Sequence, residues 1–188
     1  DIARIARHRC GVAHCPSSNA KLGHGIAPLA ELLVAGVAVG LGSDSVASNN
    51  RMDILEEARL AALLQRTRRA DPAAIPARQA LELATLGGAR ALGLEGEIGT
   101  LEEGKAADLA AFPLAVASDA RAVPWHEPEA ALVFAMAGAR ASFVAVQGEV
   151  LVREARLRRE DPELPRRVQQ AADALGAWLA TDRGAAHP

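Results

Sequence analysis

Five apolar residues run directly into a segment of small polar side chains in the sequence Val37-Ala38-Val39-Gly40-Leu41-Gly42-Ser43-Asp44-Ser45-Val46-Ala47-Ser48-Asn49-Asn50. The apolar part shows no alternation with polar residues, which is typical of a parallel strand that is buried on both faces. The polar part is rich in side chains that bond to nearby backbone groups, as in a loop. The sequence therefore predicts a buried strand over 37–41 and a polar loop over 42–50.

A second short strand is predicted upstream, at Gly11–His14, and it is followed by a loop over Cys15–Gly25. Between the two strands, Pro28 fits the first turn of a helix, where a missing N–H costs nothing, and Gly36 fits the position after its last turn. Strand, loop, helix and strand in this order form a βαβ unit with two parallel strands. These elements predict an α/β fold.

Helical and strand-like patterns continue beyond this unit. We expect helices at residues 1–9, 52–69, 77–84, 89–92 and 162–180, and strands at 108–114, 131–136 and 142–153. Gly87-Gly88 is predicted to interrupt the helical pattern, and Gln147-Gly148-Glu149 is predicted to be the turn of a hairpin. The character of the chain changes near Gly93, from α/β to mostly strands with a closing helix.

Composition excludes several classes of protein. Hydrophobic residues make up 50% of the 188 residues and charged residues 23%, which is ordinary for a globular chain and excludes a disordered one. A net charge of -2 provides no electrostatic footprint for nucleic acid or an anionic membrane. Only Cys10 and Cys15 are present, so a reducing, cytoplasmic setting is expected. Their spacing is not that of a zinc finger, and the glycine-rich segment 93–104 has no phosphate-binding pattern.

Two polar residues follow the predicted parallel strands, at the end where α/β proteins carry their functional groups. His14 closes the first strand and Asp44 follows the second, so we expect their side chains to face one cavity. Imidazole and carboxylate both bind metals, and a carboxylate also transfers protons. From the residues alone, two simpler roles stay open. His14 could be a strand-end histidine bonded to nearby backbone, and Asp44 could be a carboxylate of a helix-leading loop.

The polar residues around Asp44 have a predicted supporting role. We expect Ser45, Ser48, Asn49 and Asn50 to hold the Asp44 loop and to cap a helix that starts near residue 52, because short polar side chains satisfy free N–H groups at helix ends.

Three blocks of the sequence resemble one family. They are His14–Pro28, with its run His-Cys-Pro-Ser-Ser-Asn-Ala-Lys-Leu-Gly, then Leu41–Glu57 and Gly99–Leu109. Their order and spacing are similar to the amidohydrolase superfamily, in the branch of S-adenosylhomocysteine and methylthioadenosine deaminases, guanine deaminases and triazine chlorohydrolases. The resemblance implies a (β/α)8 TIM barrel with a small β-sandwich built from both chain ends.

The resemblance also implies a metal site. Asp44 matches the family's metal ligand after the eighth strand, which also moves a proton from the metal-bound water to the leaving group. His14 matches a position beside the substrate, and we assign His14 and Asn19 to substrate binding. One divalent ion is implied, Zn first and Fe as the alternative. No H-x-H motif occurs in the chain, so the resemblance implies that the other ligands lie upstream and that this is the C-terminal portion of a longer protein.

The resemblance divides the chain into three parts: residues 1–92 as the last two strand-helix units of the barrel, 93–160 as part of the β-sandwich, and 161–188 as a C-terminal helix and tail. The expected function is hydrolytic deamination of a purine-like or other N-heteroaromatic amine, with the isolated chain inactive. The alternatives are a chlorohydrolase acting on a triazine-like ring and a non-catalytic module that completes a split barrel. The expected partners are a small-molecule substrate and a second copy of the chain, with no nucleic acid and no membrane.

Overall fold

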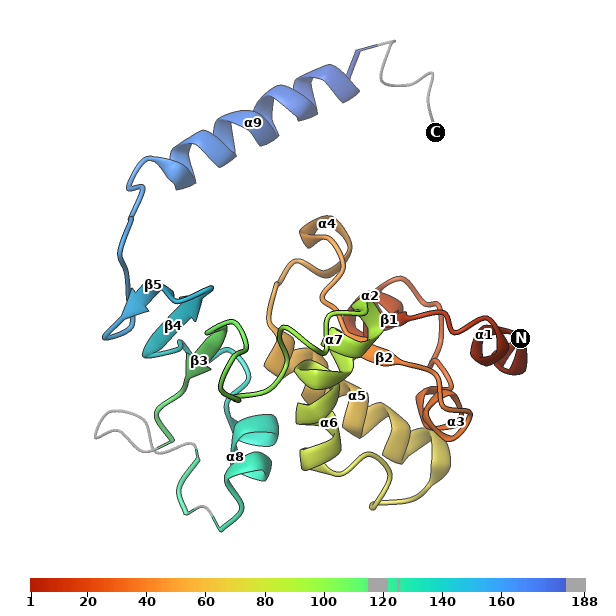
Figure 1. Ribbon diagram of the computed structural model, residues 1–188. Helices are drawn as coiled ribbons and strands as arrows, with labels where there is room; N and C mark the ends of the chain where they lie inside the picture. Colours follow the sequence, from red (N-terminus) through yellow and green to blue (C-terminus); the bar gives the residue numbers. More distant parts are fainter. Residues whose placement is uncertain (115–121, 125, 182–188) are drawn as a thin grey trace. The chain divides into compact units, whose positions relative to one another are not determined.

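The computed structural model describes residues 1–114, 122–124 and 126–181, which belong to two units of the chain (Figure 1). Unit 1 spans Asp1–Arg156 and unit 2 spans Leu157–Pro188. The helices are α1 (Ile2–Arg7), α2 (Pro16–Lys21), α3 (Leu29–Val34), α4 (Val46–Asn49), α5 (Ile54–Arg69), α6 (Ala77–Ala84), α7 (Leu86–Leu92), α8 (Pro128–Ala135) and α9 (Leu164–Leu179). The strands are β1 (Val12–His14), β2 (Val39–Leu41), β3 (Leu109–Ala111), β4 (Phe143–Val146), β5 (Glu149–Arg153) and β6 (Arg156–Leu157).

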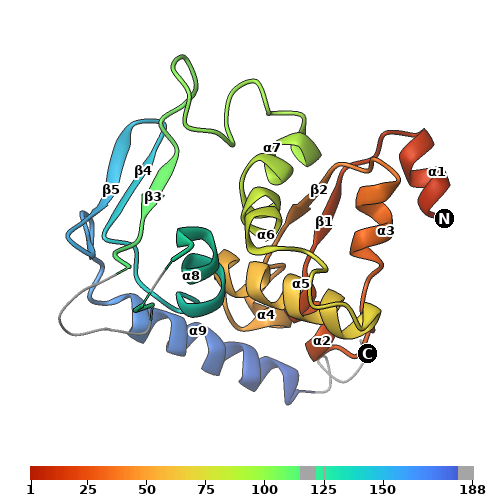
Figure 2. The same ribbon diagram turned by 90° about the horizontal axis from the view of Figure 1, so that it is seen from below.

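Strands β1 and β2 form a parallel pair in unit 1, in which Val12 lies opposite Val39 and His14 opposite Leu41 (Figure 2). The chain between them passes through α3, which contacts α1 and α5. Pro28 precedes α3 as its N-cap, and Gly36 follows it with a φ of 75°, a left-handed conformation that favours glycine. The parallel βαβ unit that the sequence predicted is confirmed.

Glycines let α7 pack directly onto the backbone of β2, as Figure 2 shows from below. A Cβ atom added to Gly40 would lie 2.4 Å from the Cα of Gly88, and one added to Gly87 would lie 2.6 Å from the carbonyl oxygen of Val39. Any larger side chain would push the helix away from the strand, because packed interiors leave no such space. The break predicted at Gly87-Gly88 is wrong, because helix α7 runs through both glycines. The helical pattern breaks at Thr85 instead.

The main core of unit 1 lies among α3, α5, α6, α8 and β2. On α5 it contains a buried stripe of small residues, Ala58, Ala61 and Ala62. The neighbouring elements add leucines and valines, namely Leu29, Leu32, Val37, Val39, Leu83 and Val133. Small side chains on α5 let neighbouring helices approach closely, while each fully buried leucine contributes about 1.5–3 kcal/mol. The core therefore anchors α5 beneath the carboxyl end of β2.

Later in the chain a second sheet has the order β3-β4-β5-β6, and its β3–β4 and β4–β5 pairs are antiparallel. Ala111 pairs with Phe143 across β3 and β4, and Phe143 pairs with Arg153 across β4 and β5. At the turn between β4 and β5, Gln147 and Gly148 have φ values of 50° and 79°, as in a two-residue hairpin turn. The predicted hairpin is confirmed, with its turn at these two residues.

Three further sequence predictions about the elements of unit 1 are wrong. The strand expected at 131–136 is helix α8, because a short apolar run does not distinguish a buried strand from a buried helix, and Pro128 in the first turn starts a helix here. The loop expected over 15–25 contains helix α2, which also begins with a proline, Pro16. The polar loop over 42–50 contains α4, a single helical turn.

Helix α9 is the main element described in unit 2, and its bounds lie within two residues of the predicted helix. Ion pairs join Asp161 to Arg167 and Glu163 to Arg166 at its start. The expected tail, residues 182–188, lies outside the described residues.

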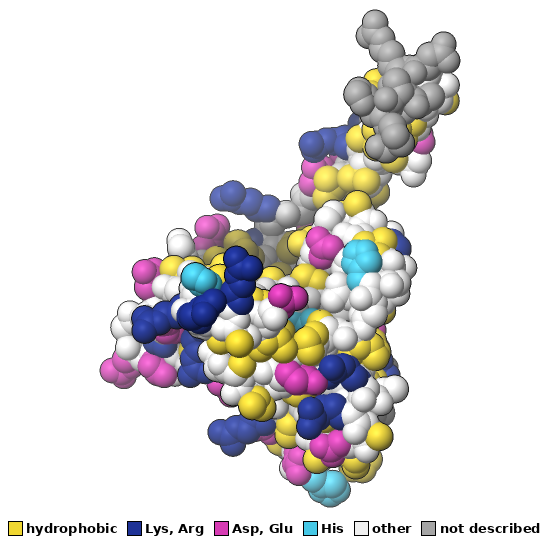
Figure 3. Space-filling model, turned by 90° about the vertical axis from the view of Figure 1, so that its right-hand side faces the viewer, with side chains coloured by type: hydrophobic (Ala, Val, Ile, Leu, Met, Phe, Trp, Pro, Cys, Tyr) yellow, Lys and Arg dark blue, Asp and Glu magenta, His cyan; other side chains and the backbone are white. Residues whose placement is uncertain are grey.

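Among the residues that the structure describes, no helix combines the length and the apolar character needed to cross a bilayer. On the face drawn in Figure 3, acidic and basic side chains both lie among hydrophobic ones.

The close contact between β2 and α7 can be tested with alanine. Gly40→Ala is expected to lower the free energy of unfolding by an amount near the upper end of about 1–3 kcal/mol, because its Cβ would meet backbone rather than a movable side chain. Gly96→Ala is the matched control, since a Cβ there meets nothing within 4 Å, and it is expected to change stability by less than about 0.5 kcal/mol. Urea unfolding of both variants measures the difference. Equal stabilities would contradict the packing described above.

Candidate functional site

The candidate site lies where the chain leaves the parallel strands β1 and β2. The ladder continues one step past the strands, since the N–H of Gly42 donates to the carbonyl of His14 at 3.0 Å. Asp44 then adopts a left-handed backbone conformation with a φ of 58°, which is uncommon for a residue other than glycine and turns the chain into α4. His14 is thus the last residue of β1, and Asp44 follows the adjacent parallel strand β2 at the same end. His14 is 5% exposed, whereas Asp44 is exposed.

Three donors converge on the carboxylate of Asp44. The hydroxyls of Ser18 and Ser48 donate to Oδ2 at 2.6 and 2.8 Å, and the N–H of Ser45 donates to Oδ1 at 2.7 Å. Ser18 is only 3% exposed and lies on α2, so one of these bonds ties the segment after β1 to the segment after β2. A carboxylate offers about four acceptor positions, so one position, on Oδ1, remains for another ligand.

The same hydrogen bonds set the charge of the site. Donation from Ser18, Ser48 and Ser45 lowers the pKa of Asp44 below its usual value, because each bond favours the ionised carboxylate. Burial lowers the pKa of His14, with the nearby Glu57 carboxylate opposing that effect. At neutral pH the site therefore pairs a fixed anion with an uncharged imidazole. Burial also raises the pKa of Cys15, which keeps its thiol protonated and unreactive.

The four residues expected to support Asp44 all take part in the bonds of helix α4 or of the loop around Asp44. Ser45 caps α4 by accepting from the N–H of Ala47 at 3.1 Å, and Ser48 binds Asp44 directly. Asn49 donates to the carbonyl of Ser43 at 2.6 Å. Asn50 ends α4 in a left-handed conformation. Its side-chain oxygen accepts a hydrogen bond from the ammonium of Lys21 on α2.

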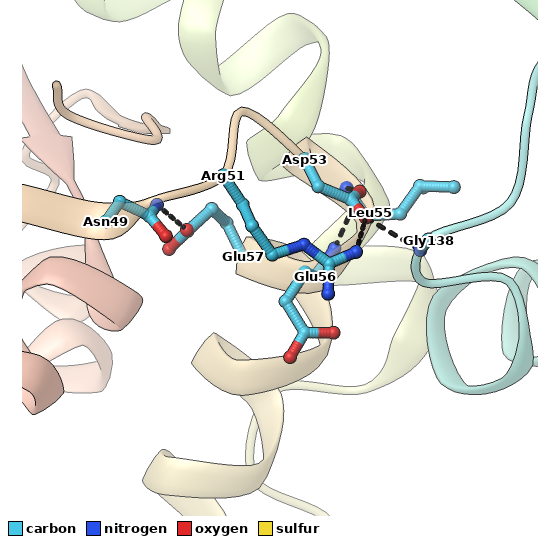
Figure 4. Close-up of polar contacts among 7 residues, drawn as sticks. All are labelled: Asn49, Arg51, Asp53, Leu55, Glu56, Glu57 and Gly138. Carbon is cyan, nitrogen blue, oxygen red and sulfur yellow. Dashed lines mark hydrogen bonds and ion pairs between the residues drawn. The ribbon is translucent and has the colours of Figure 1, made fainter. Parts of the chain in front are cut away.

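None of these four residues caps helix α5, so that part of the expectation is wrong. Helix α5 begins at Ile54 rather than at Met52, and its cap is Asp53, whose carboxylate accepts from the N–H groups of Leu55 and Glu56 (Figure 4). Asp53 also accepts from the N–H of Gly138 at 2.7 Å. The serines and asparagines are already engaged around Asp44 and α4, which leaves the cap to the aspartate immediately before the helix.

Two further residues, Asn19 on α2 and Glu57 on α5, lie in or against the two segments. Asn19 lies half-buried on α2, and among the described residues its side-chain amide has no hydrogen bond. Glu57 was not predicted as a site residue. It lies in the first turn of α5, is 1% exposed, and accepts from the N–H of Ser17 and the side chain of Asn49. A glutamate four residues after Asp53 at an otherwise apolar position of α5 was the available signal.

The described residues of this chain do not assemble a complete metal site, since they contain no group of three or more His, Cys, Asp or Glu side chains that could hold an ion. Asp44 fits a metal as a single ligand: it is exposed, ionised and has one acceptor position left on Oδ1. The chemistry of the donor set therefore supports a contribution of one carboxylate to a larger ligand set.

A family model described as the amidohydrolase family matches residues 1–151. The chain belongs to the amidohydrolase family. It is 47% identical over 163 residues to a 5-methylthioadenosine/S-adenosylhomocysteine deaminase of Moorella thermoacetica, a match that covers 87% of this chain and 37% of that protein. It is 37% identical over 179 residues to a 5'-deoxyadenosine deaminase of Methanothermobacter thermautotrophicus, covering 95% of this chain and 40% of that protein.

Solved structures of similar proteins share the fold of this chain. An adenosine deaminase from Xanthomonas campestris with bound zinc matches with a TM-score of 0.83 and 36% identity, over 88% of this chain and 37% of that one. An atrazine chlorohydrolase from Arthrobacter aurescens, complexed with zinc, matches with a TM-score of 0.76 and 38% identity, over 92% of this chain and 37% of that one. The family resemblance and the α/β fold expected from the sequence are confirmed. This amidohydrolase chain spans little more than a third of the length of these relatives.

The hydrogen bond from Ser18 is expected to hold down the pKa of Asp44. Ser18→Ala should raise this pKa toward its ordinary value of 3.8, because one of the three donors is lost. A lowered folded-state pKa contributes stability that is present above pH 3.8 and is lost as the pH falls through the lowered pKa, so the variant should lose less stability on acidification. Carbon-13 NMR titration of the carboxyl group measures the shift directly.

Ser43→Ala is the matched control for this titration. The Ser43 hydroxyl bonds the backbone carbonyl of Asp44 and not its carboxylate, so its removal should leave the pKa of Asp44 in place. Equal titration curves for the Ser18 variant and the unchanged protein would show that the bond does not act on the carboxylate.

Proposed function

We propose that this chain forms part of a metal-dependent hydrolase that deaminates a purine-like or other N-heteroaromatic amine. The observation that carries the proposal is the ionised Asp44 held by three donors at the end of β2, in a chain that is 47% identical to a methylthioadenosine/S-adenosylhomocysteine deaminase. Because the chain spans 37% of that relative, the activity proposed is that of the whole protein.

The proposed architecture has three parts. Residues 1–92 correspond to the last two strand-helix units of a (β/α)8 barrel, 93–160 to part of a β-sandwich, and 161–188 to a C-terminal helix and tail. The parallel β1–β2 pair with α3 between its strands supports the first assignment, and the antiparallel order β3-β4-β5-β6 supports the second.

Asp44 would bind a divalent ion, zinc first and iron as the alternative, together with ligands that this chain does not supply. Zinc-bound relatives support this choice of ion. When bound, such an ion supplies activated water near neutral pH. Asp44 keeps its negative charge for this role because three donors lower its pKa, and the same carboxylate can take up a proton and pass it to the leaving amine.

His14 and Asn19 are proposed to contact the substrate. An uncharged imidazole both donates and accepts, and a side-chain amide does the same, which suits the mixed donor and acceptor edge of a purine-like ring. His14 is uncharged because burial lowers its pKa, and the amide of Asn19 is not engaged by the described residues. A cleft shared by His14, Asn19 and Asp44 is part of this proposal.

A chlorohydrolase acting on a triazine-like ring is the second candidate, because the chain is also 38% identical to an atrazine chlorohydrolase. The higher identity to the deaminase from Moorella thermoacetica favours deamination. A non-catalytic module that completes a split barrel is the third candidate. We further propose a cytoplasmic protein that takes a small-molecule substrate, can associate with a second copy of itself, and uses neither nucleic acid nor a membrane.

The proposal predicts a sharp contrast between two samples. The 188-residue chain alone should retain no stoichiometric zinc after dialysis and release no ammonia from 5'-methylthioadenosine, adenosine or guanine, because its described residues assemble no group of three ligands. The longest polypeptide that its gene encodes should hold zinc and turn over one of these substrates. Metal analysis and an ammonia assay measure both properties, and chloride release from atrazine tests the second candidate.

In the active sample, Asp44→Asn should reduce kcat by about 10²–10⁴-fold, since the amide cannot accept a proton in the same way. Asp108→Asn is the control, because the Asp108 carboxylate accepts from the N–H of Gln147 at the antiparallel sheet and has no proposed catalytic role. Stoichiometric zinc in the isolated chain, or full activity in the Asp44 variant, would contradict the proposal.

A further inference from the structure

Glu57 places a carboxylate inside unit 1, beneath the two segments that form the candidate site. Its side chain is 1% exposed. Oε2 accepts from the N–H of Ser17 at 3.0 Å, and Oε1 accepts from the side-chain nitrogen of Asn49 at 2.7 Å, the second contact being drawn in Figure 4. Ser17 belongs to α2 and Asn49 to α4, so one buried carboxylate joins the segment after β1 to the segment after β2.

Each of the two contact partners of Glu57 is linked to Asp44 through one further residue, Ser43 for Asn49 and Ser18 for Ser17. The nitrogen of Asn49 that donates to Glu57 also donates to the carbonyl of Ser43, the residue directly before Asp44. Ser17 directly precedes Ser18, whose hydroxyl donates to the carboxylate of Asp44. Glu57 therefore fixes Asp44 from the backbone side and from the side-chain side without touching it.

The stability of the fold alone does not account for a carboxylate at this position. Removing a carboxylate from water costs several kcal/mol, and buried ionic groups can often be replaced by apolar side chains with no loss of stability. Among the described residues Glu57 has no ion pair with Lys, Arg or His to offset that cost. A carboxylate provides two acceptors at a fixed separation, one for a donor on α2 and one for a donor on α4, and a leucine provides none.

We infer that Glu57 is a positioning residue for the reaction: through Asn49 and the Ser17 backbone it sets the place of the Asp44 carboxylate relative to the segment that carries His14. The inference rests on the proposed function of Asp44 as metal ligand and proton carrier. Glu57 on α5 would then act as an outer hydrogen-bond partner of a metal ligand. Loss of such a partner lowers metal affinity or activity by about 10–100-fold.

A second set of side-chain contacts between α2 and the α4 segment is exposed to solvent, and it serves for comparison. The ammonium of Lys21 on α2 donates to Asn50 and to the carbonyl of Ala47 at 3.4 Å, at the surface of the site. Exposed ties of a long, flexible side chain contribute little. Lys21→Met is therefore expected to leave zinc affinity and kcat within about twofold of the unchanged protein, whereas the buried tie through Glu57 is expected to control both.

The test is Glu57→Gln in the longest polypeptide that the gene encodes. Glutamine keeps the shape but has one acceptor, so it must present an N–H to either Ser17 or Asn49, which are both donors. We expect zinc affinity and kcat to fall by about 10–100-fold, because the Asp44 carboxylate is displaced. Asn49→Ala should have a similar effect, and the effects of the two substitutions should be less than additive, since the two side chains share the Glu57–Asn49 hydrogen bond.

Gln65→Met is the matched structural control. Gln65 lies on the same helix, is fully buried, and also bridges to another segment, donating to the carbonyl of Ala27 at 2.8 Å. That segment leads into α3 and not to Asp44. The control variant should lower the melting temperature as much as Glu57→Gln does, and it should leave zinc affinity and kcat unchanged.

Hydrogen exchange separates this inference from the proposed function. In Glu57→Gln the amides of Ser45 and Ala47, which bond within the Asp44 loop, should exchange at least about tenfold faster, and in Gln65→Met they should not. A protein without zinc or turnover would refute the proposed function, and faster exchange in it would still support the positioning role. The positioning role would be overturned by unchanged exchange in Glu57→Gln. It would also be overturned if zinc affinity and kcat of Glu57→Gln equalled those of the Gln65 variant.

Discussion

Because β1 and β2 run in the same direction with His14 opposite Leu41, the segments that follow them leave the sheet at the same edge. Everything in the candidate site follows from this pairing. An antiparallel pair would have sent the two segments to opposite ends, and Ser18 could not then have reached the carboxylate of Asp44. The pairing in turn needs a crossover helix of the right length, which α3 provides between Pro28 and Gly36.

The glycines behind the sheet belong to the same constraint. Gly40 and Gly88 bring α7 against β2 at a distance that no side chain would permit. This contact supports the strand from its far side and leaves its carboxyl end unobstructed. On that end, α5 enters the core through its alanines and places Glu57 directly under both segments. The position of Asp44 therefore depends on packing on both sides of a two-stranded sheet and on the polar contacts that join the two segments.

The sequence was sufficient to predict the elements that are long or strongly patterned. The continuous apolar run ending at Leu41 predicted a buried parallel strand, and the residues that close the two strands, His14 and Asp44, lie where the end-of-strand rule places them. Helix α8 was predicted as a strand at 131–136, because an apolar run of that length fits either element. Pro128 in the first turn and packing against α5 and α6 favour the helix.

The hydrogen bonds around the site could be predicted only in part. Small polar residues next to Asp44 indicated a supported loop, but not that Asp53 rather than Ser48 or Asn49 would cap α5. A glutamate at a buried position of α5 indicated that Glu57 is unusual, but its two partners could not be predicted, because they lie 8 and 40 residues away in the chain. Such a contact exists only once β1 and β2 have paired, so it is a property of the tertiary structure and not of any local pattern.

The donors that fix Asp44 also limit what it can do. Each hydrogen bond from Ser18, Ser45 or Ser48 favours the anion, and the carboxylate thereby becomes a better permanent charge and a weaker base. Three of its roughly four acceptor positions are taken, which leaves Oδ1 as the one oxygen able to bind a further ligand. A group in this state suits a one-oxygen metal ligand that accepts a proton only when another change in the site raises its basicity. Ser18 and Ser48 therefore help to hold the carboxylate in place and lower its basicity at the same time, so removal of either serine changes both properties.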